Sequence, residues 1–184
     1  MSTRRELLRF GMGAGALGAA GLAGLPVKAF AATLEPRRVA LHNLHTGEAL
    51  DAVYWENGAY VPDAVAALNK VLRDYRTGDV HFMEPGLYDI LDAVSAKVGN
   101  RAPFQIISGY RSPKTNAMLH AKSDGVAEHS LHMDGKAMDI RLEGVALANV
   151  HKAALSLGRG GVGFYPTSNF VHVDVGRVRT WTGV

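Results

Sequence analysis

The sequence contains the stretch Ser130-Leu131-His132-Met133-Asp134-Gly135-Lys136-Ala137-Met138-Asp139, which predicts a loop leading into a buried strand over Ala137–Leu142. Two side chains here, His132 and Asp139, are of types that bind metal ions. A carboxylate between apolar neighbours on a strand is costly unless it faces a cation or hydrogen-bond donors, although a structural aspartate fits this position as well. Gly135 would let the loop bend so that His132 returns over the face that carries Asp139.

A second polar pair lies in the strand predicted at Phe170–Val175. Strict alternation places His172 and Asp174 on one face of this strand and apolar residues on the other. Two polar side chains on one face of a core strand need partners. A metal ion would provide one for the histidine, and the simpler alternative is an imidazole hydrogen-bonded to a nearby carboxylate.

The third polar segment, Ser108–Ser112, follows a short buried strand predicted at Phe104–Ile107. It presents Arg111 beside a glycine at the end of that strand. An arginine in this place could hold a substrate carboxylate or stabilise an oxyanion, and a surface ion pair is the common alternative.

The sequence has no cysteine and eight histidines, so a metal site must be built from histidine with aspartate or glutamate. A tetrahedral zinc site needs three or four convergent ligands, and three protein ligands leave one position open to water. The histidines without a partner motif lie on the predicted hairpin or helices and are not expected to bind metal: His42, His45, His81, His120 and His151.

The three polar segments occur in the order and with the internal spacing of one known family. Ser-Gly-Tyr-Arg-Ser, then Ser-x-His-x-x-Gly-x-Ala-x-Asp, then a core-strand histidine resemble the zinc D-alanyl-D-alanine carboxypeptidases and murein endopeptidases. That group shares a superfamily with lysostaphin-type peptidases and the hedgehog domain. Ser108–Asn116, Gly125–Ala127 and Gly161–Gly163 most resemble the branch that contains murein endopeptidase K. The resemblance covers roughly Phe104 to Trp181.

The resemblance implies a set of site residues. They are the zinc ligands His132, Asp139 and His172, and the substrate contacts Arg111, Tyr110 and Ser130. Arg111 would also be catalytic, because its charge would offset the negative charge that develops on the substrate carbonyl. Ser130 matches the motif serine, whose expected hydrogen bond orients a ligand.

One departure from the family concerns the residue that takes a proton from water. Several relatives place an acidic residue three positions before the last zinc histidine, or a histidine two before it, but here these positions hold Asn169 and Phe170. Asp174 is the nearest candidate for the catalytic base, and its alternative role is to hydrogen-bond the imidazole of His172. His129 is the second candidate for the base.

These residues predict metal-assisted peptide hydrolysis. The resemblance implies a zinc-dependent endopeptidase that cuts peptide cross-links between the stem peptides of peptidoglycan, joined as D-alanyl-diaminopimelate or as diaminopimelate-diaminopimelate. Two alternatives stay open: a DD- or LD-carboxypeptidase that trims stem peptides, and a zinc-containing wall-binding module without turnover.

The surrounding pattern predicts one mixed domain. Strands at Arg38–Leu44 and Ala49–Trp55 flank a turn and predict a hairpin, and helices are expected to begin at Pro62, at Glu84–Pro85 and near Lys114 and to span Val145–Leu157. This order predicts an α+β fold with a mainly antiparallel sheet flanked by helices. The resemblance implies the hedgehog and DD-peptidase type of this fold.

Residues 1–31 predict a signal peptide. Arg4 and Arg5 precede an uncharged run rich in glycine and alanine that ends at Pro26, and Ala29-Phe30-Ala31 is a small-x-small cleavage pattern. The paired arginines resemble the twin-arginine type, which implies the twin-arginine export machinery as a partner. A membrane anchor is the alternative, but the uncharged run is shorter than the ~20 residues that a spanning helix needs. We expect a mature domain over residues 32–184 in the periplasm or elsewhere in the cell envelope, without a membrane span.

The positive charge of the full chain comes from this leader. The net charge is +3, and residues 1–31 hold four of the 20 basic side chains and one of the 17 acidic ones, so 16 of each remain. A nucleic-acid-binding domain usually keeps a basic excess of its own. The sequence therefore predicts no nucleic-acid partner, and we expect a monomer.

Overall fold

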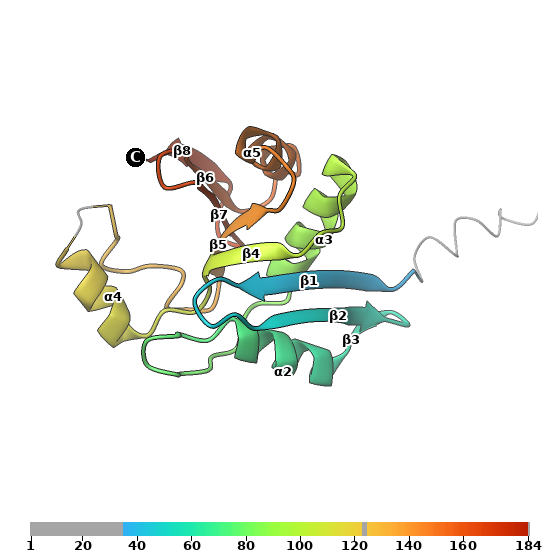
Figure 1. The fold of residues 1–184 in the computed structure, drawn as a ribbon, viewed down its shortest axis with the longest axis horizontal. Helices are drawn as coiled ribbons and strands as arrows, with labels where there is room; N and C mark the ends of the chain where they lie inside the picture. Colours follow the sequence, from blue (N-terminus) through green and yellow to red (C-terminus); the bar gives the residue numbers. More distant parts are fainter. Residues whose placement is uncertain (1–34, 123–124, 184) are drawn as a thin grey trace, which may run out of the picture.

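Eight strands form one sheet in the computed structural model, which describes residues 35–122 and 125–183 (Figure 1). In sheet order the strands are β3 (Ala59–Tyr60), β2 (Ala49–Glu56), β1 (Arg37–Asn43), β4 (Phe104–Ser108), β5 (Ala137–Leu142), β7 (Phe170–Asp174), β6 (Gly161–Tyr165) and β8 (Arg179–Thr182). The helices of the described residues are α2 (Pro62–Val71), α3 (Gly86–Val98), α4 (Pro113–His120) and α5 (Leu147–Leu155). The predicted leader, residues 1–31, lies outside the described residues.

The sheet is mainly antiparallel. Only β1 with β4 and β6 with β8 are parallel pairs, and the other five pairings of the described sheet are antiparallel. The predicted hairpin is formed by β1 and β2, and the predicted helices begin within two residues of the expected positions. The α+β class with a single, mainly antiparallel sheet is therefore confirmed.

The two faces of the sheet have different roles. On β5 and β7 the residues of one face, such as Met138 and Val173, are fully or almost fully buried in the apolar core. Helices α2, α3 and α5 pack on strands whose apolar side chains belong to this same core. The alternate positions of β5 and β7 point to the opposite face. Figure 1 shows α4 set apart from the other three helices.

Strands β6 and β8 were not among the expected elements. Gly161 and Gly163 alternate on β6 and face a crowded surface. A Cβ at Gly161 would collide with the side chains of Asp174 and Arg179, and a Cβ at Gly163 would lie 2.6 Å from the ring of Trp181. Glycine at these positions leaves space for neighbouring side chains to pack against the strand.

The segment that carries Arg111 is held by a buried carboxylate. Asp74 accepts hydrogen bonds from the backbone nitrogen of Ser112 at 2.9 Å and from its hydroxyl at 2.6 Å. Ser112 in turn caps α4 by accepting from the backbone nitrogen of Thr115. Burial works to raise the pKa of Asp74, but these hydrogen bonds lower it to about 2. Arg111 thus lies in the short segment between the end of β4 at Ser108 and the start of α4 at Pro113, and both ends of this segment are fixed.

Within the described ranges, no helix is both long enough and apolar enough to cross a membrane.

A second, partly buried carboxylate, Asp89, ties α3 to the β1–β2 hairpin and generates a test of the fold. Asp89 accepts hydrogen bonds from Arg37 at 2.7 Å, from the hydroxyl of Tyr54 at 2.9 Å and from that of Tyr60 at 2.8 Å. We expect Asp89→Ala to lower the free energy of unfolding by about 2–3 kcal/mol, because the buried Tyr54 hydroxyl loses its acceptor. Chemical denaturation measures this change.

The matched control is Asp92→Ala on the same helix. Among the described residues Asp92 pairs with Arg101 alone, whose side chain is 62% exposed, so the loss should stay below about 1 kcal/mol. Equal losses in the two variants would contradict the structural role of Asp89.

Candidate metal centre

Asp139 and His172 are direct neighbours across the sheet. Asp139 on β5 pairs with His172 on β7 in the antiparallel register, and both point to the face opposite the apolar core. Two polar side chains at paired positions stand close together because directly opposed Cβ atoms are about 5 Å apart. The strand order thus brings together residues separated by a long stretch of chain.

His132 reaches the same point from the loop that precedes β5. The loop turns at Gly135, whose φ of +67° is a left-handed conformation that suits glycine. A side chain there would also collide with the backbone carbonyl oxygen of Phe82. The bend expected from the sequence is therefore present, and glycine is required for it on two separate grounds.

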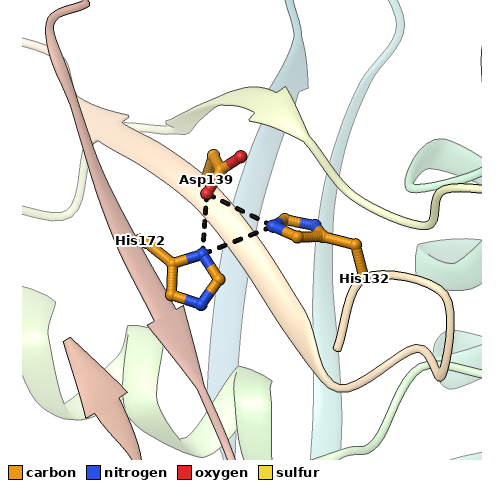
Figure 2. A group of neighbouring side chains, drawn as sticks. All are labelled: His132, Asp139 and His172. Atoms are coloured by element: carbon orange, nitrogen blue, oxygen red, sulfur yellow. Dashed lines mark hydrogen bonds and ion pairs between the residues drawn. The ribbon is translucent and has the colours of Figure 1, made fainter. Parts of the chain in front are cut away.

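The three side chains converge on one point (Figure 2). The Nε2 atom of His132 lies 3.3 Å from Nδ1 of His172 and 3.3 Å from Oδ1 of Asp139, and His172 Nδ1 lies 2.9 Å from the same oxygen. All three residues are buried, with exposed fractions of 3%, 7% and 9% for His132, Asp139 and His172. They form a group that can hold a metal ion.

Each histidine ring has one nitrogen that contacts an acceptor away from the cluster, and this contact decides whether the other nitrogen faces the cluster as an acceptor. His132 Nδ1 lies 2.8 Å from the carbonyl oxygen of Gly109, which only accepts, so this nitrogen carries the hydrogen. His172 Nε2 lies 3.1 Å from Oδ2 of Asp174, so this nitrogen donates as well. The inner nitrogens and Asp139 Oδ1 are then three lone pairs in close contact, which repel one another unless positive charge lies among them. These two nitrogens and one carboxylate oxygen can therefore act together as ligands of a cation.

The pKa values agree with a site that attracts positive charge. Burial lowers the pKa of His172, but its hydrogen bonds with Asp139 and Asp174 outweigh burial and raise the pKa to about 9. Burial also lowers the pKa of His132, and Asp139 does not offset this effect. The Asp139 carboxyl is disfavoured as an anion by burial, yet the two histidines hold its pKa well below the usual range.

Asp174 is held by five hydrogen bonds, which matters for its expected role. Its oxygens accept from the backbone nitrogens of Gly161 and Gly176, twice from Arg179 and once from His172. Burial works to raise its pKa, but these donors lower it well below the usual range. A fully engaged carboxylate is a weak proton acceptor. These contacts favour the second of the two expected roles, that of orienting His172.

Arg111 stands beside the three converging side chains. Its Nη2 atom lies 3.7 Å from Oδ2 of Asp139, and its other contacts are Asn116 at 3.2 Å and Ser108 at 3.4 Å. Its Nε atom is buried without a hydrogen-bond partner among the described residues. Burial lowers the pKa of this guanidinium. Arg111 is thus a positioned cation whose donors are only partly used.

The other expected site residues occupy different places. Ser130 lines the cavity above the three side chains, and its hydroxyl accepts a long hydrogen bond of 3.4 Å from the backbone of His132. His129 is exposed and lines the same cavity. Tyr110 does not line it, and its ring stacks on His81 with centroids 4.6 Å apart. A contact between Tyr110 and substrate stays a prediction.

The cavity has a volume of about 910 Å³ and contains residues that the sequence analysis did not single out. Tyr165, Arg179 and Trp181 line it together with the converging side chains. All three come from β6 and β8, two strands that were not predicted. The aromatic residues near the end of the chain were a usable signal, but without the parallel pairing of β8 with β6 nothing directed them to this site.

Comparison with known proteins identifies the family. The family model described as peptidoglycan L,D-endopeptidase MepK matches residues 31–181. The chain belongs to this family. Peptidoglycan L,D-endopeptidase MepK of Escherichia coli strain K12 is 48% identical over 182 residues, which cover 98% of this chain and 97% of that protein. The probable peptidoglycan L,D-endopeptidase MepK of Haemophilus influenzae is 44% identical over 169 residues, which cover 90% and 91%.

Family membership confirms the resemblance read from Ser108–Asn116 and the segments that follow it. The similarity also extends well beyond the expected Phe104–Trp181, over nearly the whole chain. The chain is therefore a peptidase of a metal-dependent kind, in agreement with the converging cluster of the MepK-type domain.

The cluster generates a prediction about metal binding. We expect His132→Ala and Asp139→Ala each to abolish both bound metal and hydrolysis, because two remaining ligands hold a divalent ion poorly. Elemental analysis after dialysis measures the metal. His42→Ala is the control, since this histidine lies on β1 outside the cluster, and it should retain metal. Full occupancy in either site variant would refute the ligand assignment.

The contacts of Asp174 generate a second prediction. We expect Asp174→Asn to weaken metal affinity by about 10–100-fold, because the partner that orients the His172 ring is altered. Turnover should then recover when metal is supplied in excess. Asp51→Asn, an exposed carboxylate on β2, is the control and should change neither quantity. Turnover that stays low at saturating metal would instead assign the catalytic base to Asp174.

Proposed function

We propose that this protein is a zinc-dependent peptidoglycan endopeptidase that hydrolyses L,D-peptide bonds in the cross-links between stem peptides. The observation that carries the proposal is the convergence of His132, Asp139 and His172 beside Arg111 in a cavity of about 910 Å³. The family and the names of the relatives from Escherichia coli and Haemophilus influenzae support the substrate class.

The relatives' names also favour one of the two cross-links compatible with the sequence. A D-alanyl-diaminopimelate bond has a D-centre on its acyl side and is a D,D bond. A diaminopimelate-diaminopimelate bond joins the carbonyl of an L-centre to an amine on a D-centre. An L,D-endopeptidase therefore acts on the second kind. We assign diaminopimelate-diaminopimelate cross-links as the substrate.

Zinc fits the donor set of two imidazole nitrogens and one carboxylate oxygen, and when bound it supplies acidified water and polarises the scissile carbonyl. His132, Asp139 and His172 would hold the ion. The Gly109 carbonyl and Asp174 keep the two rings in the tautomers that direct their lone pairs inward. Ser130 would support this arrangement through the backbone of the His132 loop.

Arg111 and a histidine complete the chemistry of the chain itself. In the reaction a water oxygen bonds to the carbonyl carbon, the amide C–N bond breaks, and the amine leaves with a proton from water. Arg111 offsets the negative charge on the carbonyl oxygen before the bond breaks. Because Asp174 is already saturated with donors, the proton is carried by His129, the exposed histidine that lines the cavity.

Export to the cell envelope completes the proposal. Residues 1–31 are assigned as a twin-arginine signal peptide, and residues 32–184 as the zinc peptidase domain, monomeric in the periplasm. The start of the family match at residue 31 is consistent with this division. Export in the folded state would let the protein acquire its metal before it meets peptidoglycan.

The proposal predicts a particular product pattern. Intact sacculi digested with the protein should release monomeric muropeptides from dimers joined by diaminopimelate-diaminopimelate bonds, and mass spectrometry resolves the products. A chelator should stop the reaction, and added zinc should restore it. Shortened monomers with intact dimers would indicate a carboxypeptidase. Binding to sacculi without any hydrolysis would indicate a wall-binding module.

A further inference from the structure

Three aromatic residues lie on the cavity wall that β6, β7 and β8 form, and the proposed function gives them no role. Tyr165, Phe170 and Trp181 line the cavity together with the proposed metal ligands. Tyr165 and Phe170 are paired across β6 and β7, and their rings stack with centroids 4.4 Å apart at 18°.

Trp181 is fixed against the sheet next to a metal ligand. It pairs with Gly163 in the parallel β6–β8 register, and its ring lies where a side chain at Gly163 would be. Its ring centroid is 5.2 Å from that of His172, and its Nε1 atom is 2.8 Å from the hydroxyl oxygen of Tyr165. The indole therefore links the edge of the metal centre to this hydroxyl.

The hydrogen bond between these two residues has only one direction. An indole N–H can donate but not accept, so the Tyr165 oxygen is the acceptor. The phenolic hydrogen must then point elsewhere. Within residues 35–122 and 125–183 the structure shows no acceptor for it.

The ring of Tyr165 has little freedom to move. One contact is the stacked Phe170, and a second is the backbone at Gly183, where a Cβ would collide with the tyrosine ring. The backbone nitrogen of Gly183 is itself bonded to the carbonyl of Phe164 at 2.8 Å. The hydroxyl is thus a rigid donor at the cavity wall, which is the property that stabilises developing charge without reorganisation.

We propose that Tyr165 is a further catalytic residue, which donates its hydroxyl hydrogen to the substrate carbonyl oxygen as that oxygen becomes negative, and that Trp181 is the positioning residue that aims it. This inference rests on the proposed function. No proton is transferred in this step, because the phenol remains neutral and only its hydrogen bond strengthens.

Arg111 does not supply every hydrogen bond that the oxyanion can accept, so a second donor can contribute. Its Nη atoms are already engaged with Asn116, Ser108 and Asp139, so the guanidinium cannot direct all of its donors at substrate. Tyr165 lines the same cavity as Arg111. A neutral donor beside a partly engaged cation would stabilise the oxyanion without adding a second buried charge.

The test is a double-mutant cycle on hydrolysis of a purified muropeptide dimer joined by a diaminopimelate-diaminopimelate bond. We expect Tyr165→Phe to lower kcat by about 10–100-fold with KM and zinc content unchanged, because a donor used mainly in the transition state is lost. Trp181→Phe should lower kcat less. The double variant should match Tyr165→Phe alone, since Trp181 acts through that hydroxyl.

Tyr60→Phe is the matched control, because its hydroxyl bonds to Asp89 away from the cavity, and its kcat should equal that of the wild type. A Tyr165→Phe kcat within twofold of wild type, a change confined to KM, or a loss explained by missing zinc would each overturn the proposal. Additive losses in the double variant would overturn the role of Trp181. A wild-type protein that does not cut the dimer would instead refute the proposed function, and this inference with it.

Discussion

Three lone pairs that meet in a buried space are the constraint on which the rest of this structure depends. His132, Asp139 and His172 direct acceptors at one point, and the facing nitrogens are 3.3 Å apart. Such an arrangement is unfavourable without positive charge among the acceptors. The Gly109 carbonyl and Asp174 keep the outer nitrogens as donors, so the inner nitrogens face Asp139, and a proton on His172 or a metal ion supplies the positive charge. The folded chain thus keeps a cation site ready.

The sheet separates the part of the molecule that provides stability from the part that provides chemistry. One face packs against α2, α3 and α5 through a continuous apolar core, which fixes the positions of β5 and β7. The other face of the same strands carries Asp139, His172 and Asp174. Because each polar residue lies between two core residues, it cannot shift without disturbing the packing on the other side. Rigidity at the candidate centre is therefore a consequence of the core.

Strand β8 contacts both the carboxylate behind His172 and the aromatic wall of the cavity. Arg179 on β8 forms a two-pronged ion pair with Asp174, at 2.6 and 3.1 Å, and so stabilises the carboxylate that orients His172. Two residues later, Trp181 holds the hydroxyl of Tyr165. A single strand thereby connects the support of the candidate metal ligands to the aromatic wall of the cavity. Its position depends on glycines in β6 that leave space for these two side chains.

The sequence by itself determined the fold class, the family and the side chains that converge. Taken alone, the patterns around His132, Asp139 and His172 allowed structural roles, and it was the resemblance of the three polar segments to one family that implied the ligand set. Only the tertiary structure decided their partners: the Gly109 carbonyl behind His132, the saturated state of Asp174, and the aromatic wall from β6 and β8. The physical reason is that alternation along a strand is a local property, whereas the neighbour across the sheet depends on strand order and register, which are set by the packing of the whole chain.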